Sequence, residues 1–220
     1  MQPMDACGCD DGFEIFDQKS ANADVDRYQR HGPDTTTAML LAMIRKHGVQ
    51  DASVLDIGGG IGVIDHELLR AGAGHAILVD ASAPALAAAR AEARRRGVLE
   101  RLDFVDGDFV SRASSIDPAD VVTLDRVVCC YPDVESLVRL SSLRARALYG
   151  LVLPRDRWIL RVGLGVMNVW FRIRGMRYRS FVHSNARVDA VVAEAGLRPR
   201  REERTFMWRV VLYDRAVTPA

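Results

Sequence analysis

The sequence predicts an α/β fold: a doubly wound, mostly parallel seven-stranded sheet that closes with a C-terminal antiparallel hairpin. Short apolar runs alternate with helical patterns from residue 53 to residue 153, an order typical of parallel strands joined by helices. At one strand–helix junction, residues 58–62, four of five residues are glycine. Two further β-like runs, residues 197–205 and 206–213, end the chain and could pair as a hairpin.

Each of the other expected strands is a short apolar run bounded by polar or turn-forming residues. These strands lie at residues 53–57, 75–79, 102–105, 121–124 and 149–153. Helices are expected where apolar residues recur every three or four positions. They lie at residues 24–30, 36–46, 63 to about 72, 83–96, 134 to about 147, 155–178 and 188–195. Asp34 or Thr35 can cap the second of these helices at its N-terminus.

Length and composition are those of one domain with a buried core: 220 residues, of which 49% are hydrophobic. We expect residues 1–33 to form an N-terminal cap segment and residues 34–220 a single domain with a helical insertion at about 155–180. The formal net charge of +1 gives no argument for nucleic acid as a partner. No apolar run reaches the ~18 residues that span a membrane. The acidic N-terminus does not resemble a signal peptide, so we expect a cytoplasmic protein.

Two kinds of cofactor loop compete for the glycine run. A nicotinamide-binding loop has the spacing G-x-G-x-x-G, and its third glycine would fall where the chain has Val63. The spacing present is instead D-x-G-x-G-x-G, beginning at Asp56. Asp80 follows the second strand, 22 residues after Gly58, and its carboxylate could accept hydrogen bonds from both hydroxyls of a ribose. Nicotinamide folds use an acid similarly, so Asp80 alone does not discriminate.

Three signals in order resemble the motifs of the class I S-adenosylmethionine-dependent methyltransferases over about residues 50–150: the glycine loop after Asp56, then Asp80, then the step G-D-F at residues 107–109. The resemblance implies a Rossmann-like methyltransferase fold with S-adenosyl-L-methionine as cofactor. It places the glycine loop under the methionine and ribose, and Asp108 near the adenine amino group. The cofactor-binding residues it implies are Asp56, Gly58, Gly59, Gly60, Gly62, Asp80, Ala81, Gly107, Asp108, Phe109, Asp125, Arg126 and, from the cap segment, Tyr28.

The residues on the acceptor side are less sharply defined, because methyl transfer from this cofactor needs mainly proximity and alignment. We expect a small-molecule acceptor, with O-methylation preferred. Tyr131 and His183 are the candidate catalytic residues. Tyr131 could orient an acceptor or deprotonate it, and His183 could line the pocket or be structural. Tyr28 or Arg30 could meet the methionine carboxylate, or both could be solvated helix residues.

The insertion after the fifth strand, residues 155–179, is rich in arginine and has the apolar spacing of a basic amphipathic helix. The run LVLPRDRW at its start is similar to the porphyrin-ester methyltransferases, whose substrate is large, apolar and carboxylated. The insertion could therefore bind an anionic, partly apolar small molecule. It could also contact a membrane surface, or pack on the sheet with solvated arginines.

The four cysteines do not form a disulfide framework in a chain of this length, so we expect reduced thiols. Cys129 and Cys130 could be small buried hydrophobes, or could join Cys7 and Cys9 in holding a soft metal; our expectation is no metal. The oligomeric state is left open. The rivals to a methyltransferase are a non-catalytic S-adenosylmethionine-binding protein and an NAD(P)-dependent oxidoreductase.

Overall fold

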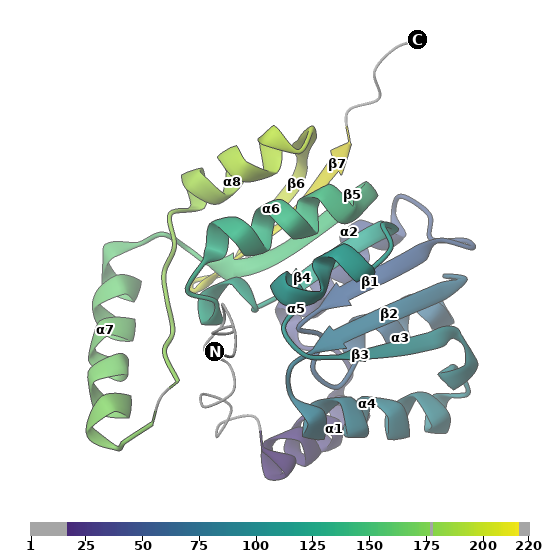
Figure 1. Cartoon of the computed structure of the whole chain (residues 1–220), viewed down its shortest axis with the longest axis horizontal. Helices are drawn as coiled ribbons and strands as arrows, with labels where there is room; N and C mark the ends of the chain where they lie inside the picture. The colour runs from purple at the N-terminus through teal and green to yellow at the C-terminus, as the bar shows by residue number, and fades with distance from the viewer. Residues whose placement is uncertain (1–16, 177, 216–220) are drawn as a thin grey trace.

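A computed structural model describes residues 17–176 and 178–215 of the chain (Figure 1). Within these residues, seven strands form one sheet in the order β3-β2-β1-β4-β5-β7-β6. Neighbouring strands from β3 to β5 are parallel, whereas β7 is antiparallel to both β5 and β6. The strands are β1 Ser53–Ile57, β2 His75–Asp80, β3 Leu102–Asp106, β4 Ala119–Asp125, β5 Ala145–Pro154, β6 Leu197–Arg204 and β7 Trp208–Arg215. The predicted fold class and its closing hairpin are confirmed.

Helices cover both faces of the sheet (Figure 1). They are α1 Gln18–His31, α2 Thr35–Arg45, α3 Val63–Arg70, α4 Ala83–Arg96, α5 Phe109–Arg112, α6 Val134–Arg144, α7 Trp158–Ile173 and α8 Asn185–Glu194, with short 3-10 turns at Leu99–Arg101, Ala113–Ser115 and Val128–Cys130. Apolar residues of α2, α3 and α4 form one core against the sheet, and those of α5, α6 and α8 form a second core on the opposite face. The two cores hold the strand ends, and thus the loops between strands and helices, in place.

The strand order reverses beside β1. From β1 the chain proceeds to β2 and β3 on one side, and later to β4 and β5 on the other. Loops that leave the carboxyl ends of β1 and β4 therefore diverge, which opens a crevice where ligands bind in such sheets. The glycine run at residues 58–62 lies at this point.

Several element boundaries differ from those expected. Asp17 caps α1 by accepting from the N–H of Ser20, so this helix begins six residues before the expected position at residue 24. Helix α6 ends at Arg144 rather than near residue 147, because Ala145 already pairs with Ala119 in the sheet. Burial in a strand here outweighs the helix propensity of the local residues. The short helix α5 was not expected.

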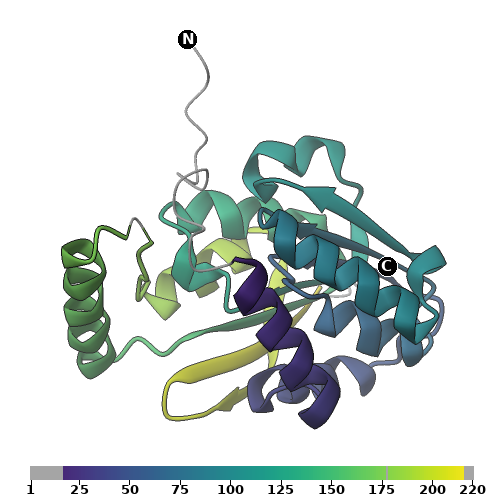
Figure 2. The same cartoon turned by 90° about the horizontal axis from the view of Figure 1, so that it is seen from below.

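Helix α7 belongs to neither layer. It stands off the edge of the sheet in both views (Figures 1 and 2), and none of its residues is buried. It ends at Ile173 rather than near residue 178, and the left-handed Gly175 follows, with φ of 75°. The insertion is therefore helical as expected, but the alternative in which it packs on the sheet is wrong.

Candidate active site

A cavity of about 720 Å³ lies at the carboxyl ends of β1, β2, β3 and β4. This volume falls within the range of roughly 300–1,000 Å³ that is typical of small-molecule sites. Loops from all four strands line the cavity, together with α1, the start of α2 and the segment that returns from α7. The chain thus brings stretches that are far apart in sequence to one place.

The loop after β1 requires glycine at several positions. Gly58, Gly60 and Gly62 have positive φ of 65°, 58° and 75°, a conformation that residues with a Cβ disfavour. A Cβ on Gly58 would lie 2.5 Å from Cγ2 of Val127. Gly62 is the N-cap of α3, so the unpaired N–H groups of that helix begin at the edge of the cavity. A ligand can approach this backbone closely.

The Asp80 carboxylate lines the cavity and is held by two backbone N–H groups. Its Oδ2 accepts from the N–H of Gly60 at 2.8 Å, and its Oδ1 accepts from the N–H of Ser82 at 2.8 Å. Burial raises the pKa of the Asp80 carboxyl, and these two hydrogen bonds oppose that shift. Each carboxylate oxygen can accept a second hydrogen bond. Both ribose hydroxyls of a nucleoside cofactor can therefore bind the same carboxylate.

Asp108 and Tyr131 are joined across the cavity. Asp108 caps α5 by accepting from the N–H of Ser111 at 3.1 Å and from its hydroxyl at 2.9 Å. The hydroxyl of Tyr131 donates to the other Asp108 oxygen at 3.0 Å. Burial and the negative charge of Asp108 raise the pKa of Tyr131, so the phenol stays protonated at neutral pH. This arrangement favours an orienting role for Tyr131 over proton abstraction.

Tyr28 lines the cavity from α1, but its hydroxyl is already engaged. It donates to Oε1 of Glu67 at 2.9 Å, and the guanidinium of Arg96 lies 4.0 Å from its ring centroid. Arg30 is exposed and pairs with Asp26 on the same helix. In this structure Tyr28 thus holds α1 against α3, and its ring is stacked on His66 with centroids 6.2 Å apart.

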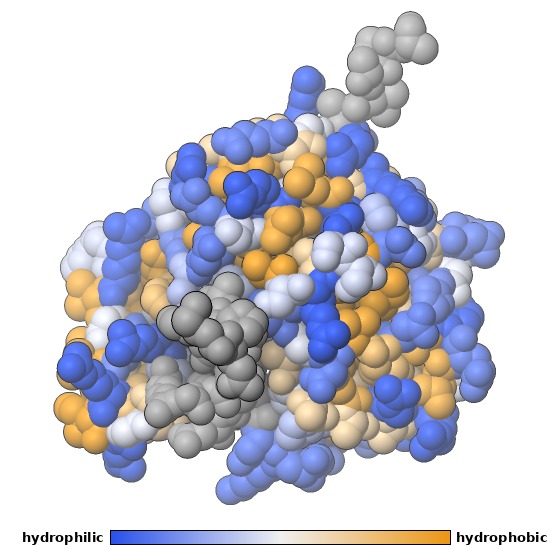
Figure 3. All heavy atoms as spheres, viewed as in Figure 1, coloured by the Kyte–Doolittle hydropathy of each residue, from blue (hydrophilic) through white to orange (hydrophobic). Residues whose placement is uncertain are grey.

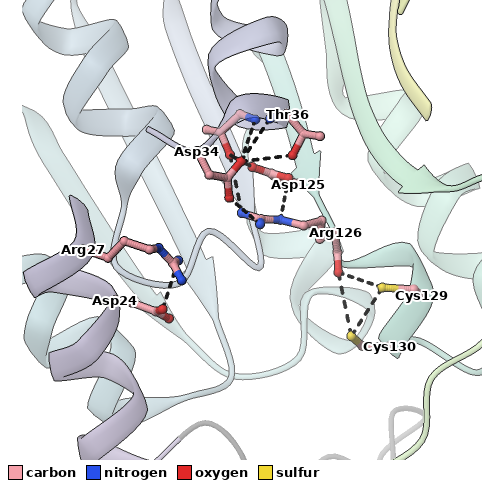
Figure 4. Close-up of polar contacts among 9 residues, drawn as sticks. Asp24, Arg27, Asp34, Thr36, Asp125, Arg126, Cys129 and Cys130 are labelled. Carbon is pink, nitrogen blue, oxygen red and sulfur yellow. Dashed lines mark hydrogen bonds and ion pairs between the residues drawn. The ribbon is translucent and has the colours of Figure 1, made fainter. Parts of the chain in front are cut away.

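Asp125 and Arg126 form a network with the start of α2 (Figure 4). Asp125 accepts from the hydroxyl of Thr37 and from Nε of Arg126, the latter at 3.1 Å, and Arg126 also pairs with Asp34. Arg126 has a φ of 63°, a strained conformation for a residue with a side chain. Burial raises the pKa of Asp125, and the charge of Arg126 opposes that shift. Sequence reasoning missed Asp34 and Thr37 as lining residues, because their only visible signal was helix capping.

A pair of neighbouring thiols lines the cavity. Sγ of Cys129 and Sγ of Cys130 are 3.7 Å apart, and both lie near the carbonyl oxygen of Arg126 (Figure 4). Sγ of Cys130 is also 3.0 Å from the hydroxyl of Tyr178. The hydrogen bond from Cys129 lowers the pKa of Cys130 to about 7, whereas the pKa of Cys129 is raised. Cys7 and Cys9, the other half of the four-thiol hypothesis, lie outside the described residues.

His183 does not line the cavity. Its Nε2 lies 3.0 Å from the carbonyl oxygen of Tyr131, and its ring stacks on Phe181 with centroids 5.6 Å apart. Burial lowers the pKa of His183, which favours the neutral ring. Of the two alternatives for His183, lining the pocket or being structural, these contacts favour the structural one. The geometry gives His183 a role in positioning the Tyr131 backbone.

Two buried carboxyl groups lie beneath the glycine loop. Asp56 at the end of β1 accepts from the hydroxyl of Thr123 at 2.6 Å, and its carboxyl group interacts with that of Asp65 in α3. Among the described residues, Oδ2 of Asp56 and both oxygens of Asp65 have no hydrogen-bond donor. Burial, together with the charge of Asp65, holds the pKa of Asp56 well above its usual range, and burial raises the pKa of Asp65 to about 7. At least one of the two is thus protonated near neutrality, when it can donate to the other.

Most of the residues expected at the cofactor line this one cavity. They are Tyr28, Asp56, Gly58, Gly59, Gly60, Asp80, Ala81, Gly107, Asp108, Phe109, Asp125 and Arg126, with Tyr131 beside them. Gly62 is not among the lining residues and is the N-cap of α3. The fold and the cavity together define an α/β protein with a nucleoside-cofactor site at the point where the strand order reverses.

Comparison with known proteins identifies the kind of cofactor protein. Residues 54–148 match the family model described as methyltransferase domain. Among curated relatives, the ribosomal protein L11 methyltransferase of Colwellia psychrerythraea is 26% identical over 77% of this chain and 60% of its own length. The protein of the same description from Pasteurella multocida is 30% identical over 61% of this chain and 47% of its own length. The chain thus spans only about half of the length of these relatives.

Solved structures show the same fold. Magnesium protoporphyrin IX methyltransferase from Synechocystis PCC 6803, with bound SAH, superposes with a TM-score of 0.63 at 18% identity, covering 93% of this chain and 85% of that one. An O-methyltransferase family protein from Burkholderia thailandensis superposes with a TM-score of 0.70 at 17% identity, covering 94% and 63%. Residues 54–148 thus resemble a methyltransferase domain, and the solved structures share the fold over nearly the whole chain. These likenesses agree with the predicted enzyme class and cofactor and favour them over the oxidoreductase rival.

Proposed function

We propose that this protein transfers the methyl group of S-adenosylmethionine to an anionic, partly apolar small molecule, with oxygen as the acceptor atom. The observation that carries the proposal is the composition of the cavity. One part is lined by the glycine loop, Asp80 and Asp108, and the same space continues to Tyr178, Phe181 and other residues of the return segment. Donor and acceptor would therefore share one enclosed volume.

In this reaction the protein mainly positions the cofactor and the acceptor. The bound cofactor supplies an activated methyl group and its own leaving group. Asp80 and the loop backbone would hold the donor, while Tyr131 and Phe181 line the part of the cavity where the acceptor would lie. Alignment of the two reactants is then the main contribution of the protein, and it can account for a large part of the rate enhancement.

One arginine in the cavity favours an acceptor that is already ionised. Arg179 lines it beside Tyr178 and Phe181, and an arginine guanidinium suits a carboxylate. Arg126, by contrast, is already paired with Asp34 and Asp125. Tyr131 holds its proton at neutral pH, which makes it a poor general base. A carboxylate oxygen needs no base, because it carries no proton to lose. These points support O-methylation of a carboxylate.

A protein acceptor is the second candidate, because the curated relatives are described as ribosomal protein L11 methyltransferases. Incubation of the full chain with S-adenosylmethionine labelled in its methyl group, and with size-separated cell extract, distinguishes the two. We expect label in the small-molecule fraction, in a base-labile ester. Label only in protein would overturn the proposed acceptor class. Cofactor binding without any labelled product would support a non-catalytic protein.

A further inference from the structure

The outward face of α7 is a continuous apolar surface. Its exposed side chains include Trp158 at 76%, Val166 at 67% and Ile173 at 78% relative accessibility. At 100° per residue, the exposed apolar residues all fall within about one third of the helix circumference. The full set is Trp158, Ile159, Val162, Val166, Val169, Trp170 and Ile173. These seven residues are called the α7 face below.

The α7 face is exposed because the opposite side of the helix contacts the segment that follows it. Asn168 donates to the carbonyl oxygen of Ser180 at 2.7 Å and accepts from its N–H at 2.9 Å. Phe171 packs edge-on against Tyr178, with ring centroids 5.7 Å apart. The return segment, of which residues 178–184 are described without a gap, therefore holds α7 through Tyr178 and Ser180 with its apolar face outward. Orange surface among blue marks this edge of the molecule in Figure 3.

Positive charge flanks the α7 face. Arg172 lies in the last turn of α7 and Arg174 is its C-cap, and neither is ion-paired with an acidic side chain among the residues that the structure describes. Arg174 lies over the ring of Trp170 at 4.9 Å. The one acidic residue of the insertion, Asp156, is paired with Arg161 at 2.6 Å. An apolar stripe between arginines, with a tryptophan near each end, is the pattern of a helix that lies in a membrane interface.

The tip of the β6–β7 hairpin extends the same surface. Phe206 is 65% exposed and Met207 is 45% exposed. The guanidinium of Arg157, at the start of α7, lies 5.2 Å from the Phe206 ring centroid, and the N–H of Arg155 donates to the carbonyl oxygen of Met207 at 2.8 Å. Two separate elements thus present apolar side chains next to each other.

We propose that α7 and the β6–β7 tip dock onto the surface of an anionic lipid bilayer. Residues of the α7 face enter the acyl boundary, while the arginines beside them contact lipid phosphates. None of the described helices meets the length and hydropathy needed to span a bilayer. A second copy of the chain fits less well, because a symmetric contact through α7 brings the two sets of arginines together. The inference does not depend on which acceptor is methylated.

Sedimentation of the full chain with vesicles tests this surface. We expect binding to vesicles of phosphatidylcholine with phosphatidylglycerol, little binding to phosphatidylcholine alone, and loss of binding as salt is raised. Val166→Asp and Ile173→Asp should each abolish most of the binding. Arg172→Gln and Arg174→Gln should each weaken it about fivefold, the equivalent of ~1 kcal/mol per arginine near an anionic surface.

Leu143→Asp is the matched control. Leu143 is an apolar residue of α6 with 57% exposure outside the α7 face, so this variant should bind vesicles like the unmodified chain. Circular dichroism and S-adenosylmethionine affinity should be unchanged in all variants, which excludes misfolding as a cause. Absence of vesicle binding, or binding unaffected by Val166→Asp, would overturn the proposal. A dimer in sedimentation velocity that Val166→Asp dissociates would assign the surface to a second copy instead.

Discussion

The hydroxyl of Tyr131 donates a hydrogen bond of 3.0 Å to Oδ1 of Asp108, and this bond ties the loop after β4 to the loop after β3. Ser111 holds the other oxygen of Asp108, so the carboxylate has an anchor on each side. The resemblance to known methyltransferases places Asp108 at the adenine. Tyr131 would then act on the cofactor through Asp108, as a positioning residue.

Tyr131→Phe should therefore weaken S-adenosylmethionine binding by about 1 kcal/mol, or about fivefold, because one hydrogen bond to Asp108 is lost while Ser111 remains. Calorimetry measures this change. Removal of a general base typically lowers the rate by about 10²–10⁴-fold. Because Tyr131 is expected to position the cofactor and not to take a proton, we expect kcat of Tyr131→Phe to fall much less than that. Tyr149→Phe is the control, since that hydroxyl bonds to Ser141 in the core. A large fall in kcat with unchanged cofactor affinity would instead make Tyr131 a base.

Asp80→Asn should weaken cofactor binding by roughly 1–3 kcal/mol, because an amide cannot accept through both atoms as the carboxylate does. Asp103→Asn is the control and should leave the affinity unchanged. The Asp103 side chain is exposed on β3 and pairs with His75. Calorimetric titration with S-adenosylmethionine, S-adenosylhomocysteine and NAD compares the two variants. Equal affinities in Asp80→Asn and the unmodified chain would show that Asp80 does not hold the ribose.

The carboxyl pair beneath the glycine loop predicts a decline in stability as pH rises. Asp65 has a pKa of about 7 in the folded protein, against roughly 3.9 for an aspartate in an unfolded chain. Between these values the folded state binds more protons than the unfolded state, so stability falls with increasing pH. The contribution of Asp65 is complete below about pH 4 and is lost as the pH rises through about 7.

Asp65→Asn should remove this dependence. The neutral amide can donate to Asp56 at every pH, so the variant should be more stable than the unmodified chain at pH 8. A gain of about 2 kcal/mol would raise the melting temperature by roughly 4–8 °C in a protein of this size. Asp117→Asn, on the surface, should change neither the melting temperature nor its pH dependence. If the melting temperatures of Asp65→Asn and of the unmodified chain change equally from pH 4 to pH 8, the raised pKa of Asp65 is contradicted.

Cys130 should react with iodoacetamide with a midpoint near pH 7, because the hydrogen bond from Cys129 lowers its pKa to about 7. Cys129 should stay largely unmodified, since it is buried and its pKa is raised. Tandem mass spectrometry distinguishes both sites from Cys7 and Cys9, and Cys130→Ser removes the reactive site. Saturating S-adenosylhomocysteine should slow the reaction if the cofactor narrows access to the cavity. A midpoint at the ordinary thiol value of about 8.5 would contradict the contact with Cys129.

The fold could be predicted closely because its signals are local. Expected and observed bounds agree for β1, and the helix expected at 83–96 is α4 to the residue, since Ser82 caps it and Gly97 ends it. The cofactor loop was equally visible, because its glycines are needed for backbone conformation. Where the boundaries were wrong, as between α6 and β5, pairing with β4 overrode local preference.

Residue order alone determined the sheet, the glycine loop and the methyl donor, because periodicity, capping and backbone freedom are properties of neighbouring residues. Only the tertiary structure decided what surrounds that loop. Thr37 reaches Asp125 from 88 positions away, Tyr131 bonds to Asp108, and His183 turns behind Tyr131. It also decided that α7 leaves its apolar face uncovered. Such contacts depend on how separate elements pack, and no spacing along one segment of chain encodes them.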